Sequence, residues 1–477
     1  MRERSVRCAL WMRSQGLLRG DVVAICSHNQ LDVSMVLVVL VTKQYILLAS
    51  AIDYLAEDLR HLLKLMKPKM VFVSNKTVTA VAKAVQEASI DPKIISFNQV
   101  PGFFEFQSVI AEPRTEQVKN FSCAQIGSSD EIALIICTSG TTGLPKGAAV
   151  SHGALLRNSY LLTEVVGTGN DWLVFTTISW VSGILYFFVN LSSGITRYVR
   201  LTLDEYSICA VIEKYKVNLI FLASGMINRL LKSDVLGKTD LSCLTRVMYG
   251  GTSLAISSNE AFSKLVPNAV MSAGYGATEM GGLFSIQTVN SKPGSCGPIS
   301  ENAQLKVIDS NTGCRLGPNQ RGELLMKSAS QMNFYYNDPE ATAKAVDEEG
   351  WFHSGDLGYY DEDGEIFVLE RLKDLIKYRG YHVAPLQIET VILSHPAVKE
   401  VAVIGVPHPV DDEHPVAFVV RVTETELVDL VAAELSDIKR IRGGVRFIDH
   451  LPKSPSGKVL RKTLRDSVMS ESRIAGN

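Results

Sequence analysis

Short apolar runs alternate with amphipathic stretches over about the first 310 residues of the chain. Four runs have the length and the content of β-branched residues that buried strands show: VVAICS (22–27), MVFVS (70–74), LIFLAS (219–224) and TRVMYGG (245–251). Stretches with apolar residues at helical spacing follow three of them, at 33–41, 78–88 and 226–236. This alternation predicts parallel sheets covered by helices, in which ligands bind where strands end.

The pattern changes after residue 300. Three runs separated by turn residues, QLKVID (304–309), GELLMK (322–327) and EIFVLE (365–370), predict a small antiparallel β unit. The tail predicts helices at 386–394 and 425–436, and strands at 401–405 and 416–422. We therefore expect an α/β protein with a large N-terminal domain, 1–372, and a small α+β domain, 373–477, joined near Lys373.

Composition narrows the class of protein. The 477 residues are 46% hydrophobic and 21% charged, with a net charge of −2, so no basic surplus favours nucleic acid as a partner. Eight cysteines are scattered without a C-x-x-C pair, which signals neither a zinc site nor a disulfide framework and fits a reducing intracellular compartment. The longest apolar stretches are too short to span a membrane. The oligomeric state stays open.

The most informative segment is a loop of small and hydroxyl residues that follows the apolar run IALIIC (132–137). Its members are Thr138, Ser139, Gly140, Thr141, Thr142, Gly143 and Lys146. Glycines let the backbone approach phosphate oxygens, hydroxyls donate hydrogen bonds, and a lysine supplies positive charge. The common P-loop pattern fails because Pro145 precedes the lysine and Gly147 follows it. We interpret the segment as a nucleotide-phosphate loop rather than a plain polar connection.

Six further motifs occur in order along the chain. They are GYGATE (274–279), YYND (335–338), GWFHSGD (350–356), ERLKDLIK (370–377), YRGYHV (378–383) and LPKSPSGK (451–458). With the phosphate loop, they resemble the adenylate-forming (AMP-binding) superfamily. The branch is that of 4-coumarate–CoA ligases, acyl-CoA synthetases and beetle luciferases, and the chain looks like an insect-type member. The resemblance implies that a carboxylate attacks the α-phosphate of Mg-ATP, and that coenzyme A then displaces AMP.

The resemblance also assigns roles to residues. Lys146 and the loop hydroxyls would hold the β- and γ-phosphates, and Glu279 would bind Mg²⁺, which favours one or two carboxylates plus phosphate oxygens. Taken alone, Glu279 would be an ordinary acid in the first turn of a helix. The remaining nucleotide contacts would be Thr278 at the α-phosphate, Tyr275 on adenine within the turn Gly274–Gly276, Asp356 on the ribose hydroxyls, and Arg371.

Three lysines of the C-terminal part receive roles in the same way. Lys458 corresponds to the catalytic lysine of adenylation, projected from a turn-forming loop. Lys377 lies in the segment that would face the active site for the thiol step after the small domain rotates. Lys373 occupies the hinge position at which that rotation takes place.

The chain departs from the family in three places. It begins almost within a helix, where relatives have an earlier strand-rich segment, so we expect a shortened N-terminus. Trp180 stands where ligases and luciferases carry a histidine that lines the acid pocket, although a tryptophan of this size could equally pack in the core. Glu370 replaces the usual Asp before the arginine. The rest of the acid pocket would include Tyr249, Gly250 and Gly251.

These observations favour an ATP-dependent acid–thiol ligase that converts a fatty or aryl acid to its acyl-CoA. One alternative is a luciferase-like oxygenase acting on the adenylate, which the missing pocket histidine disfavours. Another is a weakly active or inactive relative that only binds ligands. The resemblance implies a peroxisomal location, yet the chain ends Ile474-Ala475-Gly476-Asn477 without the usual tripeptide, so the cytosol is the alternative.

Overall fold

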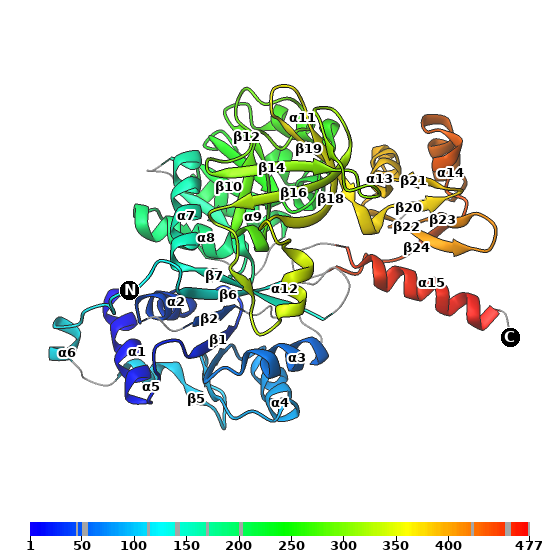
Figure 1. Ribbon diagram of the computed structural model, residues 1–477. Coiled ribbons are helices and arrows are strands. Elements are labelled where there is room, and N and C mark those ends of the chain that lie inside the picture. Colours follow the sequence, from blue (N-terminus) through cyan, green and yellow to red (C-terminus); the bar gives the residue numbers. More distant parts are fainter. Residues whose placement is uncertain are drawn as a thin grey trace.

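The computed structural model describes residues 1–43, 46–49, 56–111, 115–138, 144–167, 171–199, 204–420, 424–453 and 459–475. Within these ranges, three sheets build the large N-terminal part, and a fourth sheet builds the smaller C-terminal part (Figure 1). The arrangement confirms the expected α/β class. No helix in the described ranges is both long and apolar enough to cross a membrane.

The first sheet has eight strands. Six of them, β6, β2, β1, β3, β4 and β5, are parallel, and β7 and β17 pair antiparallel at one edge. In spatial order the strands are β17 (Phe334–Tyr335), β7 (Lys146–Ser151), β6 (Ile132–Thr138), β2 (Ile46–Ala49), β1 (Val22–Cys26), β3 (Met70–Val73), β4 (Lys93–Ser96) and β5 (Phe104–Glu105). Two strands far apart in sequence, β7 and β17, thereby become neighbours.

Helices cover both faces of this sheet, as the unbroken apolar strands require. On β1, Val22 and Ala24 pack with one group of helices and Val23 and Ile25 with the other, because successive side chains point to opposite faces. The face that contains Val22 and Ala24 is covered by α3 (Ala56–Met66) and α4 (Val78–Ala88). The face that contains Val23 and Ile25 is covered by α1 (Arg2–Ser14), α2 (Leu31–Lys43) and α5 (Phe106–Ala111). The short α6 (Thr115–Lys119) follows α5.

The second sheet contains five parallel strands and one antiparallel strand, β13, at its edge. Its order is β13 (Gly282–Ile286), β12 (Val270–Ala277), β11 (Arg246–Gly250), β10 (Leu219–Ala223), β8 (Trp172–Val174) and β9 (Arg197–Tyr198). The apolar cluster on one face includes residues of α9 (Glu205–Tyr215), α10 (Ser224–Leu231) and α11 (Ile256–Leu265).

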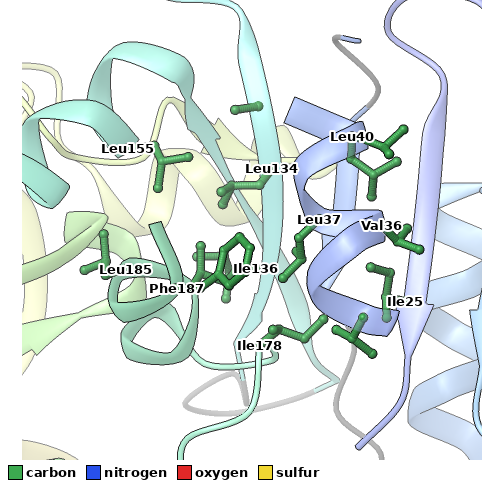
Figure 2. Packing of buried hydrophobic residues seen from close by; sticks show 14 of the residues in the cluster. Ile25, Val36, Leu37, Leu40, Leu134, Ile136, Leu155, Ile178, Leu185 and Phe187 are labelled. Atoms are coloured by element: carbon green, nitrogen blue, oxygen red, sulfur yellow. The ribbon is translucent and has the colours of Figure 1, made fainter. Parts of the chain in front are cut away.

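The opposite face shares a core with the first sheet through α7 (His152–Val166) and α8 (Val181–Ser193). Figure 2 shows Leu155 of α7 and Leu185 and Phe187 of α8 on one side of β6, and Leu37 of α2 on the other. A single apolar cluster therefore joins both sheets and fixes their relative position.

The third sheet is entirely antiparallel, which confirms the small β unit expected after residue 300. Its order is β15 (Arg315–Leu316), β14 (Ala303–Ile308), β16 (Gly322–Ser328), β18 (Phe352–Tyr360) and β19 (Ile366–Arg371). The helix α12 (Pro339–Ala345) links β17 to this sheet, with the Asp338 side chain accepting from the Ala341 N–H at its start.

The fourth sheet belongs to the part of the chain that follows the short helix η3 (Leu372–Asp374). We call this part the lid. Its strands run β21 (Tyr381–Val383), β20 (Ile376–Tyr378), β23 (Asp412–Val419) and β22 (Val401–His408), with β24 (Val445–Phe447) also on β23. Its helices are α13 (Pro385–Ser394), α14 (Glu424–Glu434) and α15 (Arg461–Ala475).

One strand and one helix differ most from their predicted boundaries. The strand expected at 416–422 begins at Asp412, because the ladder with β22 also pairs polar residues, down to His408 with Asp412. The helix expected at 226–236 ends at Leu231, where the Ser233 hydroxyl donates to the Leu230 carbonyl.

Candidate active site

The phosphate loop joins two paired strands at the edge of the first sheet. Thr138 ends β6 and lies in register with Lys146, which begins β7. The Thr138 hydroxyl is buried and has no hydrogen-bond partner among the described residues, so its polar atom is available to a group beyond them. Ser139, Gly140, Thr141, Thr142 and Gly143 lie outside the described residues, and their predicted phosphate contacts stay predictions.

Lys146 and Glu279, from separate motifs, meet at one tyrosine. The hydroxyl of Tyr335 donates to Oε1 of Glu279 at 2.7 Å, and the Lys146 ammonium lies 5.0 Å from the centroid of the same ring. Burial, followed by the Glu279 carboxylate, raises the pKa of the Tyr335 phenol, so it stays a protonated donor. Tyr335 belongs to the YYND motif (335–338), which does not by itself reveal this role.

The backbone explains why these three residues converge. Tyr335 of β17 pairs with Ala148 of β7, two residues beyond Lys146. Glu279 lies in the short helix η2 (Thr278–Met280), directly after β12, and its carbonyl accepts from the Met332 N–H at 2.7 Å. Strand pairing thus brings the phosphate-loop lysine to the predicted magnesium ligand. Thr278 precedes Glu279 at the start of η2 and is half-buried.

Asp356 is the centre of a second polar cluster. It is 4% exposed, and its two oxygens accept from the Tyr275 hydroxyl at 2.6 Å and the Arg371 Nε at 2.6 Å. Asp356 and Arg371 are register partners on β18 and β19, and Arg371 also donates to the Ser354 carbonyl at 3.2 Å. Burial and the Asp356 charge raise the pKa of Tyr275.

This geometry unites three of the predicted nucleotide contacts. Tyr275 approaches from β12, whereas Asp356 and Arg371 come from the third sheet. Asp356 is buried, and its two hydrogen bonds hold its carboxylate in a fixed orientation. A carboxylate held in this way is well placed to accept hydrogen bonds from the predicted ribose hydroxyls. The predicted stacking of Tyr275 on adenine stays a prediction, as does the contact of Arg371.

The predicted acid-pocket residues lie along one edge of the second sheet. β11 ends at Gly250, in register with Gly274 of β12, and the chain after the parallel strand β8 leads to Trp180 at the start of α8. The carboxyl ends of parallel strands meet at one edge, so these segments lie near one another. Trp180 is half-buried rather than enclosed in the core.

The end of β11 is held closely against its neighbours. A side chain on Gly250 would come within 2.7 Å of the Gly274 carbonyl oxygen, and Gly251 has a φ of +88°. The Tyr249 hydroxyl accepts from the Asn259 amide at 2.7 Å, and burial raises the pKa of Tyr249 to about 12. At Gly250 the backbones of β11 and β12 therefore lie too close together for a larger residue.

The three lysines with predicted roles in the C-terminal part lie in different surroundings. Lys377 of β20 is exposed, and its N–H donates to Glu413 at 2.9 Å. Lys373 lies in η3, and burial lowers the pKa of its ammonium. Lys458 lies outside the described residues, and Lys453 and Val459 form an isolated antiparallel bridge. Their predicted roles stay predictions.

Glu370 connects the nucleotide cluster to the lid. Its carboxylate accepts from the Leu386 N–H at 3.0 Å and from the Arg371 N–H at 3.1 Å, and burial raises its pKa. The longer side chain that replaces the usual Asp thus reaches the first turn of α13. The exchange of Asp for Glu in the sequence does not by itself reveal this contact, because Leu386 lies 16 residues further along the chain.

Comparisons with known proteins cover almost the whole chain. The AMP-binding enzyme family matches residues 1–336, and the C-terminal domain of AMP-binding enzymes matches residues 387–458. Luciferin 4-monooxygenase of Nipponoluciola cruciata is 35% identical over 430 residues, covering 87% of this chain and 78% of that protein. 4-Coumarate–CoA ligase 3 of Oryza sativa subsp. japonica is 35% identical over 385 residues, covering 76% and 68%.

Solved structures agree with this relationship. ATP-bound MatB from Rhodopseudomonas palustris has a TM-score of 0.86 at 26% identity, over 98% of this chain and 92% of that chain. Apo MatB, with the same coverage, has a TM-score of 0.74. The luciferase-like enzyme of the nonluminescent Zophobas morio mealworm has a TM-score of 0.73 at 30% identity, over 79% and 88% of the two chains. The resemblance inferred from the motifs is confirmed, and the chain belongs to the AMP-binding enzyme family.

Proposed function

We propose that this protein activates a small carboxylic acid with ATP and transfers the acyl group to the thiol of coenzyme A. In the first step a carboxylate oxygen bonds to the α-phosphorus, and the bond to pyrophosphate breaks. In the second step the thiolate bonds to the acyl carbon, and AMP leaves. The observation that carries this proposal is the convergence of Lys146, Tyr335 and Glu279 beside the phosphate loop.

The first step brings two anions together, so positioning and charge stabilisation must supply most of the rate enhancement. Lys146 supplies a positive charge at the loop, where pyrophosphate would leave. Asp356 and Arg371 would hold the ribose, which fixes the α-phosphate relative to the incoming carboxylate. Lys458, on the lid, would stabilise the charge that develops between them.

The residues present fit a magnesium ion. Among the described residues, the Glu279 carboxylate accepts a hydrogen bond only from Tyr335, at Oε1, which leaves Oε2 open. One carboxylate with phosphate oxygens and waters is a usual Mg²⁺ environment. When bound, the ion would neutralise charge on the phosphates. Glu279 would hold it, and Tyr335 would orient Glu279.

The substrate is proposed as a fatty or aryl acid. One luciferin monooxygenase and one coumarate–CoA ligase are each 35% identical to this chain. The identity of the acid therefore has to come from assay, with pyrophosphate release measured over a panel of aliphatic and aromatic acids, with and without coenzyme A. Light emission with luciferin would favour the oxygenase instead. Failure to adenylate any acid, while Mg-ATP still raises the melting temperature, would favour a binding-only relative.

Two lysine substitutions separate the half-reactions. We expect Lys458→Ala to slow acyl-adenylate formation by about 10²–10³-fold, the usual cost of removing a preorganised charge donor. We expect Lys377→Ala to leave that step near wild type and to slow thioester formation. The exposed Lys462 on α15 supplies a matched control, Lys462→Ala. Equal losses in both half-reactions for both variants would contradict the division of roles.

A further inference from the structure

The hairpin formed by β22 and β23 places two histidines side by side on the lid. His408 pairs with Asp412, and His414 pairs with Val406, so both histidines project from the same face of the ladder. Their rings lie 3.8 Å apart between centroids with an interplanar angle of 12°. The turn between the strands contains Asp411, whose side chain is 9% exposed.

Both imidazoles approach the same carboxylate oxygen. Nε2 of His414 is 2.7 Å from Oδ2 of Asp411, and Nδ1 of His408 is 3.6 Å from the same atom. One potential ligand atom from each of the three residues lies within 4.8 Å of the other two. Nδ1 of His408 also accepts from the Asp411 N–H at 3.2 Å, which assigns an unprotonated lone pair to that nitrogen. A metal ion bound at this nitrogen would take the place of the hydrogen bond from the Asp411 N–H.

Arg379 completes the arrangement on the other side of the carboxylate. Its Nε donates to Oδ1 of Asp411 at 2.6 Å, so Oδ2 is the oxygen left facing the imidazoles. Carboxylates that bind metals are usually held in this way by a hydrogen bond to the second oxygen. The guanidinium charge opposes a cation, but the Arg379 side chain is 62% exposed, so water screens much of this repulsion.

We propose that His408, Asp411 and His414 form a binding site for a divalent transition-metal ion of the Zn²⁺ type. Two imidazole nitrogens and one carboxylate oxygen are zinc-type ligands, and a water would take the fourth tetrahedral position. Imidazole also suits Co²⁺, Ni²⁺ and Cu²⁺, whereas Mg²⁺ and Ca²⁺ take oxygen ligands. The site is therefore distinct in chemistry from the one proposed at Glu279.

Binding requires a small rearrangement that the surroundings permit. Zinc–nitrogen bonds measure about 2.0–2.1 Å, so the rings must separate from their stack and turn toward a common point. The His408 side chain is 36% exposed and lies at the end of its strand, which leaves room for that rotation.

The full-length protein, stripped of metal with a chelator, tests the site. Titration with Zn²⁺ by calorimetry and with Co²⁺ by visible absorption should show one site with tetrahedral Co²⁺ bands. We expect His408→Ala, His414→Ala and Asp411→Asn each to weaken binding by at least about tenfold. His382→Ala, at an exposed lid histidine outside the cluster, and Glu279→Ala should bind as wild type does.

Each outcome decides the proposal. The proposal is wrong if the wild type does not bind one Zn²⁺ ion per chain. It is also wrong if His414→Ala binds Zn²⁺ as tightly as the wild type does, or if His382→Ala loses as much Zn²⁺ affinity as His414→Ala does. Circular dichroism of each variant separates loss of ligands from loss of fold. X-ray absorption on the zinc-loaded wild type is independent of any variant. Two imidazoles in the coordination shell support the site, and a shell without imidazole refutes it.

Discussion

Tyr335 places a neutral ring between a cation and an anion that would otherwise attract each other. Its hydroxyl holds Oε1 of Glu279, and Lys146 lies over its face. Lys146 and Glu279 form no ion pair within the described residues. A direct pair would neutralise both charges before substrate arrives. The tyrosine thus leaves the lysine available to phosphates and keeps one carboxylate oxygen open.

Replacing Tyr335 with Phe tests this positioning role, since it removes only the hydroxyl and keeps the ring beneath Lys146. Hydrogen bonds to charged groups contribute about 1.5–3 kcal/mol, so we expect the rate of pyrophosphate release to fall about tenfold or more. Because Glu279 loses its orientation, the Mg²⁺ concentration for half-maximal rate should rise. The measurement is the initial rate across a Mg²⁺ titration at saturating ATP.

The neighbouring Tyr336→Phe is the control, because Tyr336 is half-buried and follows the same strand. It should leave the Mg²⁺ dependence unchanged. If Tyr335→Phe lowers the melting temperature but shifts the Mg²⁺ curve no more than Tyr336→Phe does, the tyrosine has only a packing role.

At the residue scale, sequence motifs could predict charged groups but not their partners. Lys146, Glu279 and Asp356 carry chemistry in short patterns that can be read directly. The contact of Tyr335 with Glu279 depends on β17 pairing with β7, and the contact of Tyr275 with Asp356 depends on two sheets meeting. Such contacts between distant segments follow from tertiary packing, and no local pattern encodes them.

At the scale of elements, the hairpin of β12 and β13 holds the motif that ends in Glu279. The ladder shifts register between Tyr275 and Gly276, which brings two backbones unusually close. A Cβ atom on Gly276 would lie 2.0 Å from the Gly282 carbonyl oxygen, so the backbone itself would have to move. The glycine is therefore required by packing within the hairpin, whether or not nucleotide is bound.

Gly276→Ala should accordingly destabilise the protein by about 1–3 kcal/mol, the usual cost of overpacking. Displacement of the following Glu279 should also raise the KM for ATP. Thermal unfolding and ATP-dependent kinetics measure the two effects. Gly225→Ala provides the matched control, because no heavy atom lies within 4 Å of its added Cβ in α10.

In that control, replacing a helical glycine should be neutral or stabilise by about 0.5–1 kcal/mol. A Gly276→Ala protein as stable as Gly225→Ala would show that the hairpin relaxes without cost.

The elements themselves were largely predictable, with instructive exceptions. Short apolar runs rich in Val and buried on both faces, such as β1 and β3, are typical of strands in a covered sheet. The first half of β23 lacks that signal, because Asp412, Glu413 and His414 are polar and become a strand only through pairing with β22. Local hydrophobicity cannot reveal a strand of this kind.

At the scale of the whole molecule, a few contacts fix the lid against the N-terminal part. The Lys232 ammonium, at the end of α10, donates to the Val398 carbonyl of the lid. Burial raises the pKa of Glu205 on α9, but the hydrogen bond from Arg229 and, more weakly, the charge of Lys399 beside Val398 lower it, and the net shift is downward. The overall arrangement matches ATP-bound MatB better than apo MatB at equal coverage. These contacts therefore belong to an arrangement like that of the ATP-bound relative.

Because the Lys232 contact joins the lid to the N-terminal part, we predict that its removal affects one half-reaction more than the other, although Lys232 has no predicted role in the active site. Lys232→Met keeps most of the apolar stem and removes the charged donor, so it should shift the lid away from this arrangement. We expect acyl-adenylate formation to slow about 3–10-fold, which corresponds to about 0.7–1.4 kcal/mol and to the net contribution of one ordinary hydrogen bond. Thioester formation from preformed adenylate should not slow. Rapid-quench kinetics of each half-reaction measure the two rates.

Lys238→Met is the control, because the Lys238 ammonium pairs with Asp234 in the same region without reaching the lid. Equal rates in the two variants would show that the Val398 contact does not bias the lid.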